Sequence, residues 1–149
     1  SITGLDSVYC FENEDKQFVY TPSFGTLAGP VTGDLFNPAV VGEGLHTLTI
    51  THGVGVCKTA DTIQVTVLPE LTSTLIASAD TICNGEGTIL TVSASGGDPN
   101  VLYSYSWSHG LFPITTNSVN PQVTTTYEVI TSDGCSDDAV DSVTILFSE

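Results

Sequence analysis

One sequence pattern occurs twice in this chain and constrains the fold more than any other feature. Residues 46–67 and residues 127–145 each contain an alternating strand, a turn with glycine, a cysteine, a short polar stretch and a second alternating strand. A single offset of 78 residues, the difference between 135 and 57, places Cys57 on Cys135 and Val65 on Val143. Repetition of this kind is typical of arrays of small β domains, which reach, bind or space rather than catalyse.

The strand signals predict an all-β fold. They alternate apolar and polar residues at a period of two, lie between Gly, Pro, Asn and Asp, and are accompanied by no helical periodicity. The predicted strands are 17–21, 45–51, 62–67, 71–78, 88–95, 101–108, 124–131 and 141–147. Short strands with regular turns favour two tandem immunoglobulin-like β-sandwich domains. We place them at 1–68 and 69–149, because Pro69 cannot donate a hydrogen bond to a sheet.

The charge balance excludes several classes of partner. Seventeen acidic residues oppose only two lysines, which gives a net charge of −15. Nucleic acids need a basic surface, so we expect no nucleic-acid binding. Anionic membrane surfaces are disfavoured for the same reason. No apolar run approaches the roughly 20 residues of a membrane span, and we expect no membrane insertion.

The four cysteines, Cys10, Cys57, Cys83 and Cys135, predict an oxidising compartment and an extracellular location. Zinc is disfavoured because no C-x-x-C spacing occurs. Two cysteines fall in each half, so we predict the pairs Cys10–Cys57 and Cys83–Cys135. Each bridge would close a loop of about 50 residues and contribute roughly 4 kcal/mol in the chain-entropy model.

Strand order leaves an alternative pairing open. In the plain immunoglobulin order, the first turn and the turn between the last two strands lie at opposite ends of a sandwich. Two cysteines there could not approach within the roughly 7 Å between Cα atoms that a disulfide needs. The alternative is Cys10–Cys135, with Cys57 and Cys83 left for neighbouring repeats.

Acidic residues in the predicted loops suggest a calcium site. On the same strand order, one loop end of the first domain, the linker and one loop end of the second domain converge. Calcium takes six to eight oxygen ligands and would offset the repulsion among these carboxylates. The candidate ligands are Glu12, Glu14, Asp15, Glu70, Asp133, Asp137 and Asp138. The alternative is a solvated acidic surface without an ion, and we expect no other cofactor.

Several segments in each half carry a family resemblance. In the second half they are 80–94, Tyr105-Ser-Trp-Ser, 121–129, Asp133-Gly-Cys and Val143-Thr-Ile, and in the first half they are 4–10, 25–30, 36–39 and 44–50. In these segments the chain resembles the PKD-like and immunoglobulin-like repeats of Bacteroidetes cell-surface proteins. Such repeats occur in long adhesins, including those of gliding motility, which are exported by the type IX secretion system. The resemblance implies a non-catalytic adhesion module.

A tripeptide of Asp, Ser or Thr, and an aliphatic residue occurs four times. It resembles the O-glycosylation sequon of Bacteroidetes extracytoplasmic proteins. The hydroxyl-bearing residues are Ser7, Thr62, Thr81 and Ser142. The alternative is that the same tripeptide is a common way to begin a strand. A hydroxyl that points into the core cannot carry a glycan, so only outward-facing members of the set qualify as acceptors.

No motif in the chain predicts catalysis. The sequence lacks a G-x-S-x-G elbow and a phosphate-binding glycine loop with lysine, so we predict no catalytic residues. The leading hypothesis is an interaction and spacer module whose partners are neighbouring repeats. The alternative is a carbohydrate-binding accessory of a secreted polysaccharide-degrading enzyme, which would bind surface glycans through exposed aromatic residues. We expect Trp107 in the core of the second domain and not on a sugar-binding surface.

Overall fold

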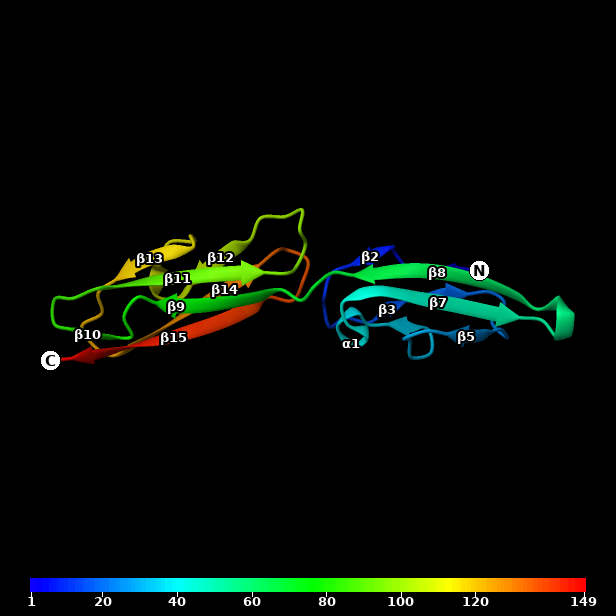
Figure 1. The fold of residues 1–149 in the computed structure, drawn as a ribbon, viewed down its shortest axis with the longest axis horizontal. Helices are drawn as coiled ribbons and strands as arrows, with labels where there is room; N and C mark the ends of the chain where they lie inside the picture. Colours follow the sequence, from blue (N-terminus) through cyan, green and yellow to red (C-terminus); the bar gives the residue numbers. More distant parts are fainter. The chain divides into compact units, whose positions relative to one another are not determined.

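The computed structural model describes all residues from Ser1 to Glu149 and divides them into two compact units. Unit 1 comprises Ser1–Glu70 and unit 2 comprises Leu71–Glu149 (Figure 1). Strands account for 50% of the residues and helices for 7%, so the all-β prediction is confirmed. None of the helices has the length and apolar character needed to cross a membrane.

Unit 2 consists of two sheets. Its strands are β9 (Thr72–Ala77), β10 (Thr81–Cys83), β11 (Thr88–Ser95), β12 (Ser104–Trp107), β13 (Thr116–Val119), β14 (Thr125–Ser132) and β15 (Ala139–Ser148), with a 3-10 turn at Ser108–Gly110. One sheet has the order β13-β11-β9 and the other β10-β15-β14-β12. All neighbours are antiparallel except β10 and β15. In the letters used for the immunoglobulin fold, β9, β11 and β13 correspond to strands A, B and E, and β12, β14 and β15 correspond to strands C, F and G.

The two sheets of unit 2 share one core. Its buried members come from every strand and are Leu75, Ile82, Leu90, Val92, Trp107, Val119, Tyr127, Val129 and Ile145. Trp107 is only 8% exposed, and its indole Nε1 donates a hydrogen bond to the carbonyl oxygen of Ile114 at 2.9 Å. The predicted core position of Trp107 is confirmed. Burial of its indole also removes the best sugar-stacking surface in the chain.

Unit 1 has one larger sheet and two short strand pairs. The sheet has the order β2 (Val8–Tyr9), β8 (Thr59–Val67), β7 (Gly44–His52) and β5 (Thr26–Ala28). The pairs are β1 (Ile2–Thr3) with β4 (Val19–Tyr20), and β3 (Lys16–Gln17) with β6 (Leu35–Phe36). The core contains Ile2, Phe18, Phe36, Leu48, Ile50, Val65 and Val67.

Unit 1 departs from the predicted sandwich because its middle segment cannot form long strands. Residues 22–44 contain three prolines and five glycines, which restrict or weaken regular pairing. The segment instead forms a short helix, α1 (Pro38–Val41), which no sequence pattern predicted. Asn37 caps it by accepting a hydrogen bond from the Val40 amide at 3.2 Å, and Pro38 occupies the first helical turn.

The sequence repeat corresponds to a structural repeat at the end of each unit. The last two strands form an antiparallel hairpin, β7–β8 in unit 1 and β14–β15 in unit 2 (Figure 1). Val67 and Ile145, which the offset of 78 residues brings into register, are both fully buried. A short earlier strand, β2 or β10, runs parallel to the end of the last strand. This parallel strand extends the repeat beyond the segment in which the sequence shows it.

Candidate functional site

The four cysteines occupy two equivalent positions in each unit. Cys57 ends a 3-10 turn (Gly55–Cys57) in the β7–β8 loop, and Cys135 lies in the β14–β15 loop. We call these two the hairpin cysteines. Cys10 follows β2, whose Tyr9 pairs with Val67, and Cys83 ends β10 opposite Ser148. We call Cys10 and Cys83 the edge cysteines.

The structure corrects the predicted intradomain disulfides. Cys10 and Cys135 are disulfide-bonded, whereas Cys57 and Cys83 are free and exposed. The predicted pairs Cys10–Cys57 and Cys83–Cys135 are therefore wrong. The alternative pairing expected this result, with Cys10 and Cys135 bonded and Cys57 and Cys83 free.

The reason is the length of the last strand in each unit. The hairpin cysteine lies before this strand begins, and the edge cysteine lies beside the point where it ends. β8 has nine residues and β15 has ten. At about 3.3 Å per residue, the two cysteines of one unit are roughly 30 Å apart. A disulfide needs Cα atoms within about 7 Å, so no intradomain bridge can form.

We predict that thiol labelling distinguishes the two classes of cysteine. Iodoacetamide applied to the native, unreduced protein should modify Cys57 and Cys83, because both are free and exposed. Cys135, which is exposed, should react only after reduction, and the buried Cys10 only after reduction and unfolding. Peptide mapping by mass spectrometry gives the positions, and single Cys57→Ser and Cys83→Ser variants should each lose one label. Native labelling at Cys10 or Cys135 would contradict the assignment.

Asp133 organises the hairpin loop of unit 2. The residue is only 4% exposed, and each of its two carboxylate oxygens accepts two hydrogen bonds. Oδ1 accepts from the amides of Cys135 at 3.0 Å and Ser136 at 2.7 Å. Oδ2 accepts from the Asp98 amide at 2.8 Å and the Ser136 hydroxyl at 2.9 Å. The carboxylate thereby ties the β14–β15 loop to the β11–β12 loop.

Close approach of the two loops depends on Gly97. Its φ is +69°, and a Cβ at this position would collide with the Asp133 carboxylate. Burial alone would raise the pKa of Asp133, but the hydrogen bonds from Asp98, Cys135 and Ser136 outweigh it and leave the pKa below its ordinary value of 3.8. The ionised carboxylate is therefore the form that the fold stabilises.

We predict that Asp133→Asn lowers the stability of unit 2 at neutral pH by about 1–3 kcal/mol. An amide at the Oδ2 position would direct a donor at the Asp98 amide and leave that group unsatisfied. Because the folded pKa is depressed, the contribution of the ionised Asp133 is present above about pH 4 and is lost as the pH falls through the folded pKa. Denaturant titrations at pH 7 and pH 3 measure this difference.

The matched control for Asp133→Asn is Asp138→Asn, at an exposed position in the same loop. This control should leave the free energy of unfolding within about 0.5 kcal/mol of the parent. Equal destabilisation by both substitutions, or an Asp133→Asn effect that persists unchanged at pH 3, would contradict the assigned role.

The other predicted calcium ligands have separate surroundings. Glu12 and Glu14 form ion pairs with Lys16, whose pKa their hydrogen bonds raise. Asp15 accepts a hydrogen bond from the side-chain amide of Asn37 at 3.0 Å. The chain contains no group of three or more His, Cys, Asp or Glu side chains that could hold a metal ion.

Calcium binding by Glu12, Glu14, Asp15, Glu70, Asp133, Asp137 and Asp138 stays a prediction. If calcium binds, the melting temperature of the protein should be higher in millimolar calcium than in EDTA. The double substitution Asp137→Asn and Asp138→Asn should abolish this increase. Superimposable melting curves in calcium and EDTA would leave these acids as a solvated surface.

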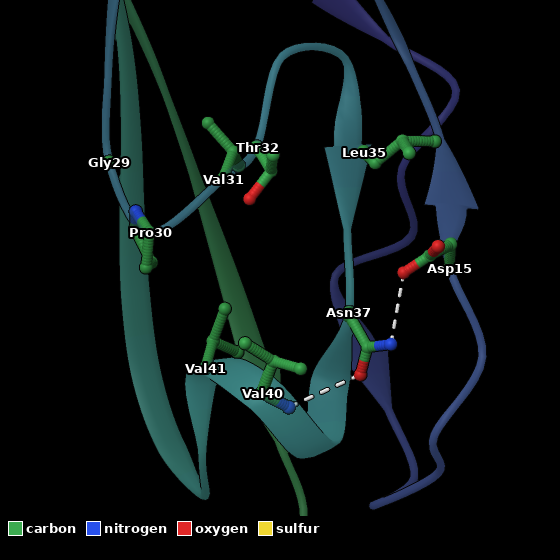
Figure 2. A pocket seen from close by; sticks show the side chains of 9 residues that line it. All are labelled: Asp15, Gly29, Pro30, Val31, Thr32, Leu35, Asn37, Val40 and Val41. Carbon is green, nitrogen blue, oxygen red and sulfur yellow. Dashed lines mark hydrogen bonds between the residues drawn. The ribbon is translucent and has the colours of Figure 1, made fainter.

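Unit 1 contains a pocket of about 490 Å³ beside α1, which no sequence pattern indicated (Figure 2). Its lining residues are Asp15, Gly29, Pro30, Val31, Thr32, Leu35, Asn37, Val40 and Val41. Figure 2 shows the Asn37 side chain between Asp15 and α1, bonded to both. Asp15 is the one charged residue of the lining, which otherwise combines apolar side chains and Gly29 with the polar Thr32 and Asn37.

All four predicted glycosylation residues, Ser7, Thr62, Thr81 and Ser142, are exposed. At one of them the preceding aspartate has a structural role. The Asp141 carboxylate accepts hydrogen bonds from the amides of Leu75 at 2.7 Å and Ser142 at 2.8 Å. Modification stays a prediction, which an intact-mass measurement of protein from its native host would test.

No protein-family model and no curated protein matches the chain. Solved structures similar to it include the amphioxus IgVJ-C2 molecule, at 16% identity and a TM-score of 0.45 over 76% of this chain and 64% of that one. The four N-terminal Ig domains of Dscam1 isoform 8.4 give 13% identity and a TM-score of 0.45, over 98% of this chain and 44% of that one. Murine CEACAM1b gives 12% identity and a TM-score of 0.40, over 99% of this chain and 100% of that one. At these TM-scores the immunoglobulin-like assignment rests on the strand order of unit 2.

Proposed function

We propose that this chain is a non-catalytic extracellular interaction and spacer module from a secreted bacterial surface adhesin or filament. The observation that carries the proposal is the repetition of one β unit with cysteines at the same two positions. Repeated units that stack or link in series build length and surface, and each one adds the same structural element. The partners of such a module are neighbouring repeats of the same or a larger protein.

The cysteines and the surface charge support an extracellular location. Disulfides persist in oxidising compartments, and Cys10 and Cys135 are disulfide-bonded. A net charge of −15 keeps an exposed protein soluble and separate from other anionic surfaces. The resemblance to PKD-like repeats of Bacteroidetes adds the finer part of the proposal, which is export by the type IX secretion system and a role in adhesion or gliding motility.

The surroundings of the aromatic residues favour a spacer over a carbohydrate-binding accessory. Trp107 is buried, and the four tyrosines that could replace it are half-buried; these are Tyr9, Tyr20, Tyr103 and Tyr105. Two of their hydroxyls are engaged, since Tyr9 accepts from the Asp6 amide and Tyr103 donates to the Gly96 carbonyl. The exposed aromatic rings are instead Phe24 and Phe112, one in each unit.

Two measurements test the proposed function. The native gene that contains this chain should encode further copies of the 78-residue unit and no polysaccharide hydrolase. Insoluble polysaccharide pull-downs and glycan arrays should show no retention of the purified chain. Retention that Phe24→Ala or Phe112→Ala abolishes, or a hydrolase domain in the same gene, would establish the carbohydrate-binding accessory instead. Thr74→Ala, at an exposed position on β9, serves as the matched surface control.

A further inference from the structure

The two free cysteines occupy positions that are oxidised elsewhere in the same chain. Cys57 is free, but its equivalent Cys135 is disulfide-bonded. Cys83 is free, but its equivalent Cys10 is disulfide-bonded. The bonded set therefore contains one hairpin cysteine and one edge cysteine, and so does the free set. Each position is thus shown, in one of the two units, to be capable of forming a disulfide.

We propose that Cys57 and Cys83 form disulfides between copies of this chain, a hairpin cysteine of one copy with the edge cysteine of the next. The proposal rests on the proposed function as a unit of an array and names its partner, a second Ig-like unit with the complementary cysteine. Because the two joined surfaces differ, the contact is heterologous. A heterologous contact that does not close into a ring produces an open linear chain.

The surface around Cys57 is apolar and carries a positive charge. Val54 is 82% exposed, and Val56 is fully exposed in the same loop. Lys58 follows Cys57 and forms no ion pair, whereas the other lysine, Lys16, is held by Glu12 and Glu14. In a chain of net charge −15, this loop is the one place where an unengaged cationic side chain adjoins a free thiol.

The surface around Cys83 has the complementary character. The Glu86 carboxylate accepts a hydrogen bond from the Cys83 amide at 3.0 Å, which fixes a negative charge beside the thiol. Exposed apolar side chains lie at the same end of unit 2. Leu146 is 51% exposed two residues before Ser148, the pairing partner of Cys83. Val123 is 68% exposed beside Thr124, whose hydroxyl accepts from the Phe147 amide.

These two surfaces therefore match in charge and in apolar character. Lys58 of one copy faces Glu86 of the next in the proposed contact, while Val54 and Val56 meet Leu146 and Val123. Attraction between opposite charges mainly accelerates the correct encounter and disfavours contacts between like ends. Two hairpin ends would bring lysines together, and two edge ends would bring glutamates together.

The oxidant is a low-molecular-weight disulfide, for which glutathione disulfide is the probe. The Cys57 thiolate attacks one glutathione sulfur, the glutathione S–S bond breaks, and one glutathione thiolate leaves. The Cys83 thiolate of the second copy then attacks the Cys57 sulfur and displaces the second glutathione. Two protein thiols are oxidised to one disulfide, glutathione disulfide is reduced to two thiols, and these take up the two protons that the cysteines release.

Complementary single-cysteine variants test this polarity. Cys57→Ser retains the free edge thiol, and Cys83→Ser retains the free hairpin thiol. With glutathione disulfide at about 0.15 M salt, where charge repulsion between copies is screened beyond about 8 Å, a mixture of the two variants should form heterodimers that stop at that size. Each variant alone should stay monomeric, and the parent should form a ladder on non-reducing gels. Peptide mapping should recover Cys57 linked to Cys83.

Two variants of equal charge change test the assigned surface. Lys58→Gln and Gln64→Glu each make the chain more negative by one charge, but Gln64 lies on β8, away from the loop. Lys58→Gln in the copy that supplies Cys57 should slow heterodimer formation about threefold, and Gln64→Glu should change it little. Equal rates for the two variants, homodimers as abundant as heterodimers, or no cross-link in the mixture would overturn the proposal.

The outcome of the cross-linking experiment can be told apart from the outcome of the tests of the proposed function. If the copies fail to cross-link while the native gene encodes further repeats, the disulfide inference fails and the spacer function stands. If the gene encodes a hydrolase while the heterodimer forms, the spacer function fails and the thiol pairing stands.

Discussion

The pairing of the last two strands is the interaction on which the rest of each unit depends. β7 and β8 pair over nine residues each, and the inward side chains of this hairpin include Leu48, Ile50, Val65 and Val67, all essentially inaccessible to solvent. In unit 2 the same hairpin buries Tyr127, Val129 and Ile145. Because side chains alternate across a strand, a slip of one residue would turn every one of these groups to solvent. Burial therefore fixes the register, and the register fixes where each cysteine lies.

The two hairpin loops reach similar positions by different means. In unit 1, Gly53 has a φ of +99°, and a Cβ there would collide with the Cys57 carbonyl, so the loop closes through backbone approach. In unit 2, the Asp133 carboxylate closes the loop by accepting amide and hydroxyl hydrogen bonds. The first device leaves Val54 and Val56 exposed, whereas the second produces a polar, acidic loop. Duplicated units thus keep the strand framework while their loop ends differ in charge.

Most strands could be predicted because they alternate strictly and are long enough to show it. β11 matches its predicted range, Thr88–Ser95, and the long hairpin strands differ from theirs by up to three residues at either end. The short strands β1, β2, β5, β6, β10 and β13 were missed because strands of two to four residues are too short to show a period. The Gly- and Pro-rich segment around α1 was missed for the same reason, and the pocket beside it has no local signature. Asp133 was predicted only as a calcium ligand, and its buried structural role was missed because that role depends on the distant Asp98 amide and Gly97.

The wrong disulfide prediction shows that the number of cysteines in each half of a chain does not determine their pairing, because the topology decides which cysteines can meet. Two cysteines in each half favoured intradomain bridges, and loops of that length would give large entropic stabilisation. That stabilisation is available only if the geometry lets the sulfurs meet, and the last strand of each unit separates its two cysteines by its whole length. In any unit with this strand order, a cysteine in the hairpin loop and a cysteine beside the end of the last strand lie at opposite ends of that strand. They cannot bond to each other, so a disulfide at either position needs a partner outside the unit, which suits these cysteines to joining units in series.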